Sequence, residues 1–331
     1  MGGLGRAGGR AEGGPGRYVG AMLAEPATPI QLALGQDALD RRAELRRAGW
    51  ADVPWPRRLV LVDQSGEVPV RAGSGGTRLA TVDLPENGTA PATDLLLGVD
   101  DDGIALCGRV VARDDAPVGA EVTWAGLRQV GLRLPADERG IVAELLALAN
   151  WHGTHTRCPR CGAGTTVAGL GWWRTCVEDG SEHYPRTDPA VIATLVDAGG
   201  NVLLGRQTRW PPGAFSTLAG FVEPGESAES AVVREIAEEV GLVPDRVRYV
   251  GSQPWPFPAS LMLGFSAELD AVRPSPTVDG VEIAEARWLS RAELGPAAVA
   301  GEVRLPGRLS IAHHLIGRWY GADLPDEWCR W

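Results

Sequence analysis

The pattern of apolar and polar positions is clearest along residues 229–240, ESAVVREIAEEV. Apolar side chains stand at positions 231, 232, 236, 237 and 240, which is the spacing of one face of an amphipathic helix. Gly241 follows directly, and glycine is a frequent helix terminator. Glu235, Glu238 and Glu239 stand at i, i+3 and i+4, so their carboxylates share one face. The pattern predicts a helix over 229–240 that presents a cluster of negative charge.

Short apolar runs between turn residues dominate residues 26–150. Examples are 57–63 (RRLVLVD), 93–108 (TDLLLGVDDDGIALCG) and 131–135 (GLRLP). The DDDG at 100–103 separates two apolar runs, which predicts a β-hairpin. A helix is expected over 136–150, ADERGIVAELLALAN. This region holds no evident catalytic constellation, so we expect 26–150 to be a β-rich domain that serves as a scaffold or dimerisation domain.

The stretch SQPWPFPAS at 252–260 follows neither periodicity. Each proline fixes its φ angle and removes a backbone donor, so a helix or a central strand is excluded and a stiff, extended segment is expected. Trp255 and Phe257 are two residues apart and project to the same side of such a segment. Two interpretations of the rings stay open, because they can border a flat ligand or pack into the core.

Length, charge and composition narrow the classes of protein. A chain of 331 residues predicts two or three domains. A net charge of -10 argues against a DNA-binding protein, a general nucleic-acid binder or a membrane-surface binder. No run of about 18 apolar residues is present, so no membrane span is expected. Residues 1–25 are rich in Gly, Arg and Ala and lack the apolar core of a signal peptide, so they are expected to form a disordered tail.

Three of the five cysteines cluster within residues 151–187, which we expect to be a separate small module. An odd number of cysteines fits a metal site in a reducing cytoplasm better than a disulfide framework. The candidate ligands are Cys158, Cys161, Cys176 and Asp179, with His183 and His155 nearby. Three thiolates and one further ligand predict a closed, structural zinc site in a zinc-ribbon-like module. The alternative is a module that has lost its metal and is held by packing alone.

A longer motif surrounds the helix predicted over 229–240. Residues 220–242, GFVEPGESAESAVVREIAEEVGL, fit the pattern G-x₅-E-x₇-R-E-U-x-E-E-x-G-U at every fixed place, where U is aliphatic. The fixed places are Gly220, Glu226, Arg234, Glu235, Ile236, Glu238, Glu239, Gly241 and Leu242. Carboxylates this close repel one another unless a cation lies among them, and hard divalent cations such as Mg²⁺ or Mn²⁺ take oxygen ligands. A solvated acidic helix face would explain the charges but not the glycines, the arginine and the spacing together.

This motif resembles the Nudix box. The resemblance implies metal-dependent hydrolysis of a nucleoside diphosphate linked to another group, because a metal ion neutralises phosphate oxygens and activates water. It implies that Glu235 and Glu239 are metal ligands and that Glu238 is a ligand or a base. By the same resemblance, Arg234 orients a neighbouring glutamate, and Glu226 supports the loop or completes the metal shell.

Two other stretches, SQPWPFPAS at 252–260 and YPRTDPAVI at 184–192, resemble the NADH pyrophosphatase (NAD-capped RNA hydrolase) branch of the Nudix superfamily. That branch carries an N-terminal β domain and a four-cysteine zinc ribbon, and Asp179 in place of a cysteine is the clear departure. The resemblance implies an α+β protein with a Nudix α/β/α sandwich at 188–331, preceded by the β-rich domain and the zinc-ribbon-like module. It also implies a homodimer that builds its pocket from both chains.

The resemblance assigns further residues to the site. Phe221 and Tyr184 would flank the base of the bound nucleotide, and Gln253 and Ser260 would supply polar contacts. Ala312 and Ile192 would line the pocket. Glu282 would be a metal ligand from outside the Nudix box. His313 and His314 lie on an amphipathic stretch and are expected to be surface or packing residues.

The resemblance therefore implies hydrolysis of NAD(H) at its diphosphate to NMN(H) and AMP with Mg²⁺ or Mn²⁺, and removal of NAD caps from RNA 5′ ends. One alternative is a broader Nudix hydrolase that acts on ADP-ribose or related dinucleotides. Another is a non-catalytic Nudix module that senses nucleotides. The complete set of glutamates favours an enzyme, because a binding module does not need every metal ligand.

Overall fold

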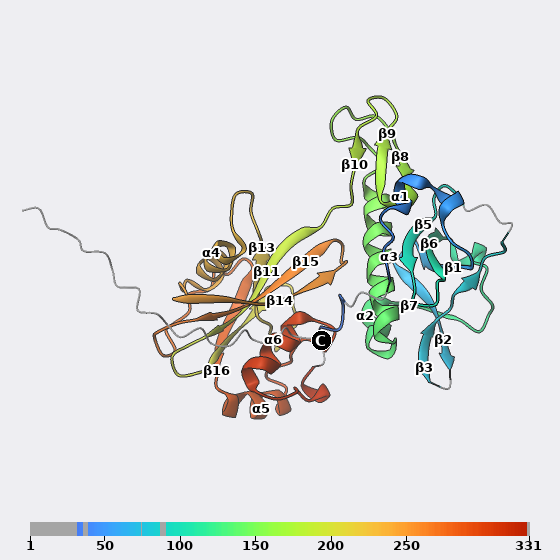
Figure 1. Cartoon of the computed structure of the whole chain (residues 1–331). Coiled ribbons are helices and arrows are strands. Elements are labelled where there is room, and N and C mark those ends of the chain that lie inside the picture. The colour runs from blue at the N-terminus through green and yellow to red at the C-terminus, as the bar shows by residue number, and fades with distance from the viewer. Residues whose placement is uncertain (1–31, 36–38, 74, 87–90, 330–331) are drawn as a thin grey trace, which may run out of the picture.

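The computed structural model describes residues 32–35, 39–73, 75–86 and 91–329. The tail expected over 1–25 lies outside these residues. Figure 1 shows two lobes, with the long helix α3 (Ala136–Thr154) along the inner side of the N-terminal lobe and a small three-stranded sheet near one end of that helix. Among the described residues, no helix has the length and apolar character needed to cross a membrane.

Two small sheets and α3 build the N-terminal lobe. One sheet has the order β4–β1–β6–β5 and the other β3–β2–β7. Their strands are β1 (Arg57–Asp63), β2 (Glu67–Gly73), β3 (Gly76–Leu79), β4 (Val82–Asp83), β5 (Leu95–Val99), β6 (Ala105–Val111) and β7 (Thr123–Gly126). The short helices are α1 (Leu45–Ala48) and α2 (Leu127–Val130). One buried cluster joins both sheets to α3, including Val62 of β1, Val68 of β2 and Val142 of the helix.

Most predicted elements of this lobe are confirmed. The strand at 57–63 is β1, the DDDG separates the antiparallel pair β5 and β6, and the predicted helix forms and runs four residues further, to Thr154. The apolar run at 131–135 is not a strand. Its first three residues, Gly131–Arg133, form a 3₁₀ turn between α2 and α3. Gly131 packs against the C-terminal lobe, since a Cβ there would stand 2.9 Å from Leu309 Cδ1.

The C-terminal lobe is a sheet covered by helices on both faces. The sheet has the order β14–β15–β11–β12–β16, and β13 also pairs with β11. Its strands are β11 (Asp188–Val196), β12 (Val202–Gln207), β13 (Leu218–Phe221), β14 (Arg246–Trp255), β15 (Ser260–Glu268) and β16 (Ile283–Leu289). The helices are α4 (Ala228–Val240), α5 (Arg291–Val299) and α6 (Ile311–Tyr320).

Alternation along β11 explains the three layers. Val191, Ala193 and Leu195 join the buried cluster beneath α4, whereas Ile192 joins the cluster beneath α6. Side chains of a strand alternate between the two faces of its sheet, so this central strand supplies both cores. The expected α/β/α sandwich is therefore confirmed.

The proline-rich stretch at 252–260 is a hairpin and not a free extended segment. Its first half is the end of β14, which is an edge strand, and Pro254 lies opposite Leu261 of β15. An edge strand tolerates proline because its outer side has no partner strand that needs the missing N–H. Residues 256–259 form the turn into β15. Trp255 and Phe257 lie on one side, as predicted, with ring centroids 5.0 Å apart.

This hairpin also joins the two lobes. Trp255 and Phe257 pack against the buried cluster of the N-terminal lobe, and Asn150 Nδ2 of α3 donates to the carbonyls of Pro256 and Pro258 at 3.1 Å each. The packing interpretation of the two rings therefore holds.

Candidate active site

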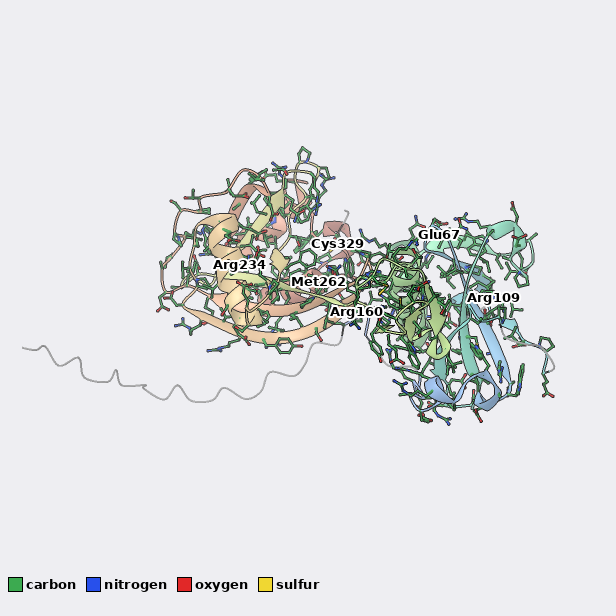
Figure 2. The ribbon with its side chains drawn as sticks, turned by 90° about the horizontal axis from the view of Figure 1, so that it is seen from above. Glu67, Arg109, Arg160, Arg234, Met262 and Cys329 are labelled. Carbon is green, nitrogen blue, oxygen red and sulfur yellow. The ribbon has the colours of Figure 1, made fainter. Side chains whose placement is uncertain are left out.

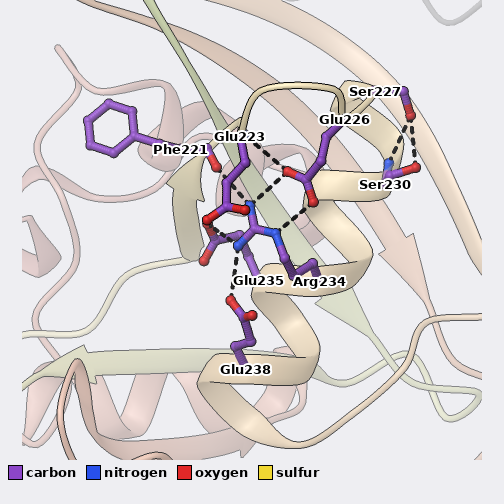
Figure 3. A network of polar contacts seen from close by, with 8 residues as sticks. All are labelled: Phe221, Glu223, Glu226, Ser227, Ser230, Arg234, Glu235 and Glu238. Carbon is purple, nitrogen blue, oxygen red and sulfur yellow. Dashed lines mark hydrogen bonds and ion pairs between the residues drawn. The ribbon is translucent and has the colours of Figure 1, made fainter.

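Arg234, in the middle of α4, lies at the centre of a polar network. Its guanidinium donates to both oxygens of Glu226 at 2.7 and 2.9 Å, and to one oxygen each of Glu235 and Glu238 at 2.9 Å. It also donates to the carbonyl of Phe221, whose ring points away from the network (Figure 3). The hydrogen bonds from Arg234 lower the pKa of Glu226 to about 2. The arginine thus fixes the loop before the helix and two glutamates on it.

Glu239 differs from its neighbours because no arginine among the described residues pairs with its carboxylate. The residue is only 2 % exposed, and neither carboxylate oxygen has a hydrogen-bond partner among the described residues. Burial, with Glu235 and Glu282 nearby, raises the pKa of Glu239 to about 8. A buried carboxylate without a partner is costly, so this position fits a bound cation that would restore the charged form.

Local sequence holds these carboxylates in place. Ser227 caps α4 by accepting from the Ser230 N–H, and Gly241 ends it in the left-handed conformation at φ +68°. Gly220 lies directly against Glu235, since a Cβ at this position would stand 1.9 Å from the Glu235 carboxylate carbon. A side chain at 220 would therefore displace Glu235, which explains the glycine at this place of the motif.

A cavity of about 740 Å³ is lined by the acidic groups. Glu235, Glu238 and Glu239 line it from α4, and Glu282 lines it from the loop before β16. Asp279 lines it as well and accepts from the backbone N–H groups of residues 281–283, which folds the loop that carries Glu282. The structure therefore brings the four predicted Mg²⁺ or Mn²⁺ ligands to one cavity. They do not form a tight ligand cluster, because Arg234 draws Glu235 and Glu238 toward itself.

A second cavity of about 780 Å³ adjoins the first, and the two share Gln207, Arg209 and Ala219. The predicted pocket residues Ile192 and Ala312 line it, as do both rings of the hairpin. Arg128 of the N-terminal lobe also lines it, with its guanidinium carbon 4.3 Å from the Phe257 ring centroid and 5.3 Å from that of Trp255. Trp255 and Phe257 thus pack between the lobes and also border a cavity.

The other predicted substrate residues do not line this second cavity. Gln253 is 0 % exposed, and its amide donates to the Leu309 carbonyl and accepts from the Ile311 N–H, so it ties the hairpin to the start of α6. Ser260 begins β15 and lines neither cavity. Phe221 lines the acidic cavity and is 58 % exposed. Tyr184 is 56 % exposed and lines neither cavity, and its hydroxyl donates to Glu182.

The cysteine module brings together the predicted zinc ligands. Its sheet has the order β10–β9–β8, with β8 (Thr165–Ala168), β9 (Trp173–Cys176) and β10 (Glu182–His183). The ligand atoms of Cys158, Cys161, Cys176 and Asp179 all lie within 4.8 Å of one another. Ser181 donates its N–H and hydroxyl to Asp179, and hydrogen bonds from Ser181 lower the pKa of Asp179 to about 2.

Of the candidate fourth ligands, the structure thus selects Asp179. His183 contacts the Ser181 hydroxyl, and the ring of His155 lies against the Trp151 carbonyl. Three sulfurs and one carboxylate oxygen at this spacing fit a tetrahedral zinc site.

Sequence reasoning missed three residues at the cavities: Asp279, Arg128 and Arg209. Asp279 stands in a DG turn just before Glu282, and that turn signal could have found it. Arg128 and Arg209 carry no local signal, because only the packing of distant segments brings them to the cavities. His313 is buried and His314 is bonded to the Arg308 carbonyl, as expected of packing residues.

Comparison with known proteins agrees with this architecture. Residues 186–306 match the NUDIX domain, and residues 53–151 match a domain described as an NADH pyrophosphatase-like rudimentary NUDIX domain. The β-rich N-terminal lobe therefore corresponds to a rudimentary NUDIX domain, which the sequence analysis did not predict.

The chain is 37% identical over 312 residues to the NAD-capped RNA hydrolase NudC of Mycobacterium tuberculosis strain H37Rv, covering 89% of this chain and 96% of the relative. It is 40% identical over 200 residues to the human NAD-capped RNA hydrolase NUDT12, covering 57% of this chain and 43% of that protein. Among solved structures, a NUDIX hydrolase from Nitrosomonas europaea aligns with a TM-score of 0.39 at 19% identity, over 50% of this chain and 90% of that one.

The Nudix motif lies on a helix of an α/β/α sandwich, and two domains of the chain match Nudix models. These features define the class of protein as a Nudix hydrolase. The chain belongs to the Nudix family, in the branch with an NADH pyrophosphatase-like N-terminal domain.

Proposed function

We propose that this protein hydrolyses the diphosphate of NAD(H) to NMN(H) and AMP, and removes NAD caps from RNA 5′ ends by the same reaction. One observation carries the proposal: the unpartnered, buried Glu239 lies in an acidic cavity that adjoins a cavity bordered by aromatic rings. A dinucleotide has the matching shape, with rings at both ends of a diphosphate. The names of the relatives point to the same substrates.

Glu235, Glu239 and Glu282 would hold Mg²⁺ or Mn²⁺, and Glu238 would act as a further ligand or as the base. A bound cation would neutralise phosphate oxygens and lower the pKa of a coordinated water. Arg234 keeps Glu235 and Glu238 in fixed rotamers through its two hydrogen bonds. Glu226 fixes Arg234 in turn, so it supports the reaction without touching substrate. Hydrolysis adds water across the P–O–P bond, and each product keeps one phosphate.

Ring binding would use the second cavity and the rim of the first. Ile192 and Ala312 supply an apolar wall, and Phe221 presents an exposed ring at the acidic cavity. Tyr184 lines neither cavity of its own chain, so it would act on the pocket of a second subunit. The proposal therefore includes a homodimer, a cytoplasmic location, and one zinc ion held by Cys158, Cys161, Cys176 and Asp179.

Product analysis tests the proposal. The purified chain is incubated with NADH and Mg²⁺ or Mn²⁺, with and without EDTA, and the products are separated by chromatography. Equal amounts of NMNH and AMP that depend on the metal are expected, and NAD-capped RNA should yield a 5′-monophosphate end. Cleavage of ADP-ribose in preference to NADH would indicate the broader hydrolase. NADH binding without turnover in folded protein would indicate a sensing module.

A further inference from the structure

Arg209 occupies the junction of the two cavities. It stands two residues after the end of β12, and it lines both the acidic cavity and the cavity bordered by Trp255 and Phe257. Of the residues shared by the two cavities, Gln207 and Ala219 are uncharged. Arg209 is therefore the shared cation between the metal-binding glutamates and the aromatic border.

The guanidinium of Arg209 is not engaged by an acidic residue. Its Nε donates to Gln207 Oε1 at 3.0 Å, and no carboxylate among the described residues pairs with it. Arg234, the other arginine of the acidic cavity, is fully engaged by glutamates. Arg206, three residues earlier, is paired with Glu285 at 3.3 Å. Arg209 thus keeps most of its donors available in a cavity where the other guanidinium has none to offer.

The backbone beside Arg209 is anchored to the loop that carries Glu282. The Thr208 N–H donates to the Glu282 carbonyl at 2.9 Å, and the Thr208 hydroxyl donates to the Val281 carbonyl at 2.9 Å. These two bonds fix the position of Arg209 relative to a proposed metal ligand. A group held in this way loses little freedom when it binds a ligand.

The charge of the acidic cavity leaves a role for such a cation. Six carboxylates and two guanidiniums line it, and Arg234 is already engaged. The carboxylates that line the cavity repel a diphosphate. Cations that contact its phosphate oxygens are therefore needed to bind it. Bound metal would supply positive charge at the glutamates, and Arg209 supplies it where the acidic cavity meets the cavity bordered by Trp255 and Phe257.

We propose that Arg209 binds the diphosphate of the substrate where it passes between the two cavities. This inference rests on the proposed function in one respect, namely that the ligand has a diphosphate between two ring systems. The guanidinium of Arg209 has a planar fork of N–H donors, which can bind two phosphate oxygens at once. Arg209 would thereby position the dinucleotide so that one of its phosphorus atoms lies at the metal-binding glutamates.

The test compares Arg209→Gln, Arg209→Lys and the control Arg206→Gln, each checked for an unchanged melting temperature. NADH kinetics with Mg²⁺ should show kcat/KM lowered about 10- to 100-fold in Arg209→Gln, mainly through KM, since charge-assisted hydrogen bonds to the diphosphate are lost. Arg209→Lys should recover part of the loss, because it keeps the charge without the fork. Arg206→Gln should behave as the wild type.

Calorimetry separates this inference from the proposed function. The probe is α,β-methylene-ADP, a diphosphate that cannot be cleaved between its phosphorus atoms, with adenosine as the comparison. Arg209→Gln should weaken binding of the diphosphate about tenfold or more and leave adenosine binding unchanged. Equal binding of the diphosphate by Arg209→Gln and wild type would overturn the inference. If wild type fails to cleave NADH, the proposed function fails, and the calorimetric comparison still decides the role of Arg209.

Discussion

At the scale of single residues, Glu239 links the fold to the chemistry. Its pKa is about 8 in the folded chain, against an ordinary value of 4.5, because burial opposes the charged form. Between these pH values the folded state holds a proton that the unfolded state has released. Without metal, stability should therefore fall as pH rises from about 4.5 to about 8, and below that window the contribution is fully present.

Replacing Glu239 with Gln should remove this dependence. With EDTA present, Glu239→Gln should melt above the wild type at pH 8.5, and the two should converge near pH 4.5. Added Mg²⁺ should raise the wild-type melting temperature more at pH 8.5 than at pH 6, since protons compete with the cation, and should have little effect on the variant. Turnover of the variant should fall by orders of magnitude.

Glu238→Gln is the matched control for this experiment. Its side chain is 61% exposed, and the fall in metal-free stability that we attribute to Glu239 should persist in this variant. A wild-type protein whose metal-free stability is flat between pH 5 and 8 would show that Glu239 does not hold a proton in this way.

Residue spacing alone was enough to predict the acidic face of α4, because a helix fixes which neighbours share a side. It was not enough for Gln253. That residue lies in the stretch that resembles a family motif. Its side-chain amide is hydrogen-bonded to the backbone of Leu309 and Ile311, more than fifty residues away in sequence. Such long-range hydrogen bonds leave no trace in local pattern.

At the scale of elements, the cysteine module shows how a turn and a hairpin can gather ligands without a fourth cysteine. The turn at 158–162 is closed by the Gly162 N–H to the Cys158 carbonyl, and a similar turn brings the Gly180 N–H to the Cys176 carbonyl. Both turns could be predicted from the spacing of Cys and Gly. Spacing also placed Asp179 at the fourth position, with His183 and His155 nearby, but it could not predict the Ser181 contacts that orient the carboxylate.

Substitutions at Asp179 test the metal site. Asp179→Ala should lower zinc affinity by more than the 10- to 100-fold that loss of an outer-shell partner usually causes, because a direct ligand is removed. Asp179→Cys should bind zinc more tightly than the wild type, since it completes a four-thiolate site. Zinc content by elemental analysis, competition with a chelator, and melting temperature measure these effects.

Glu178→Gln removes a neighbouring exposed charge and should leave zinc content unchanged. Wild-type protein without zinc, and with the same melting temperature as Cys158→Ser, would mean that packing alone holds the module.

The hairpin of β14 and β15 shows the limit of prediction at this scale. Three prolines correctly excluded a helix and an inner strand, and the observed edge position agrees with that rule. The turn itself was missed, because it is stabilised by Asn150 of a helix in the other lobe.

At the scale of the whole molecule, the two lobes share one cavity wall. Arg128 of the N-terminal lobe stands over the rings of the hairpin, and Leu309 of the C-terminal lobe joins the N-terminal core (Figure 2 shows the two lobes in contact). A domain that seemed from sequence to be a scaffold thus contributes to the candidate site. Docking between domains depends on surface shape, which local patterns do not encode.

The final prediction concerns the homodimer. If Tyr184 completes the pocket of a second subunit, a chain with Tyr184→Ala and a chain with Glu239→Gln should each be defective as homodimers. A mixed dimer, purified with two affinity tags after co-expression, should recover about half of the wild-type rate per dimer. One of its two pockets combines intact glutamates from the Tyr184→Ala chain with Tyr184 from the Glu239→Gln chain. Light scattering checks the mass, and a mixed dimer as inactive as its parents would place Tyr184 outside the partner's pocket.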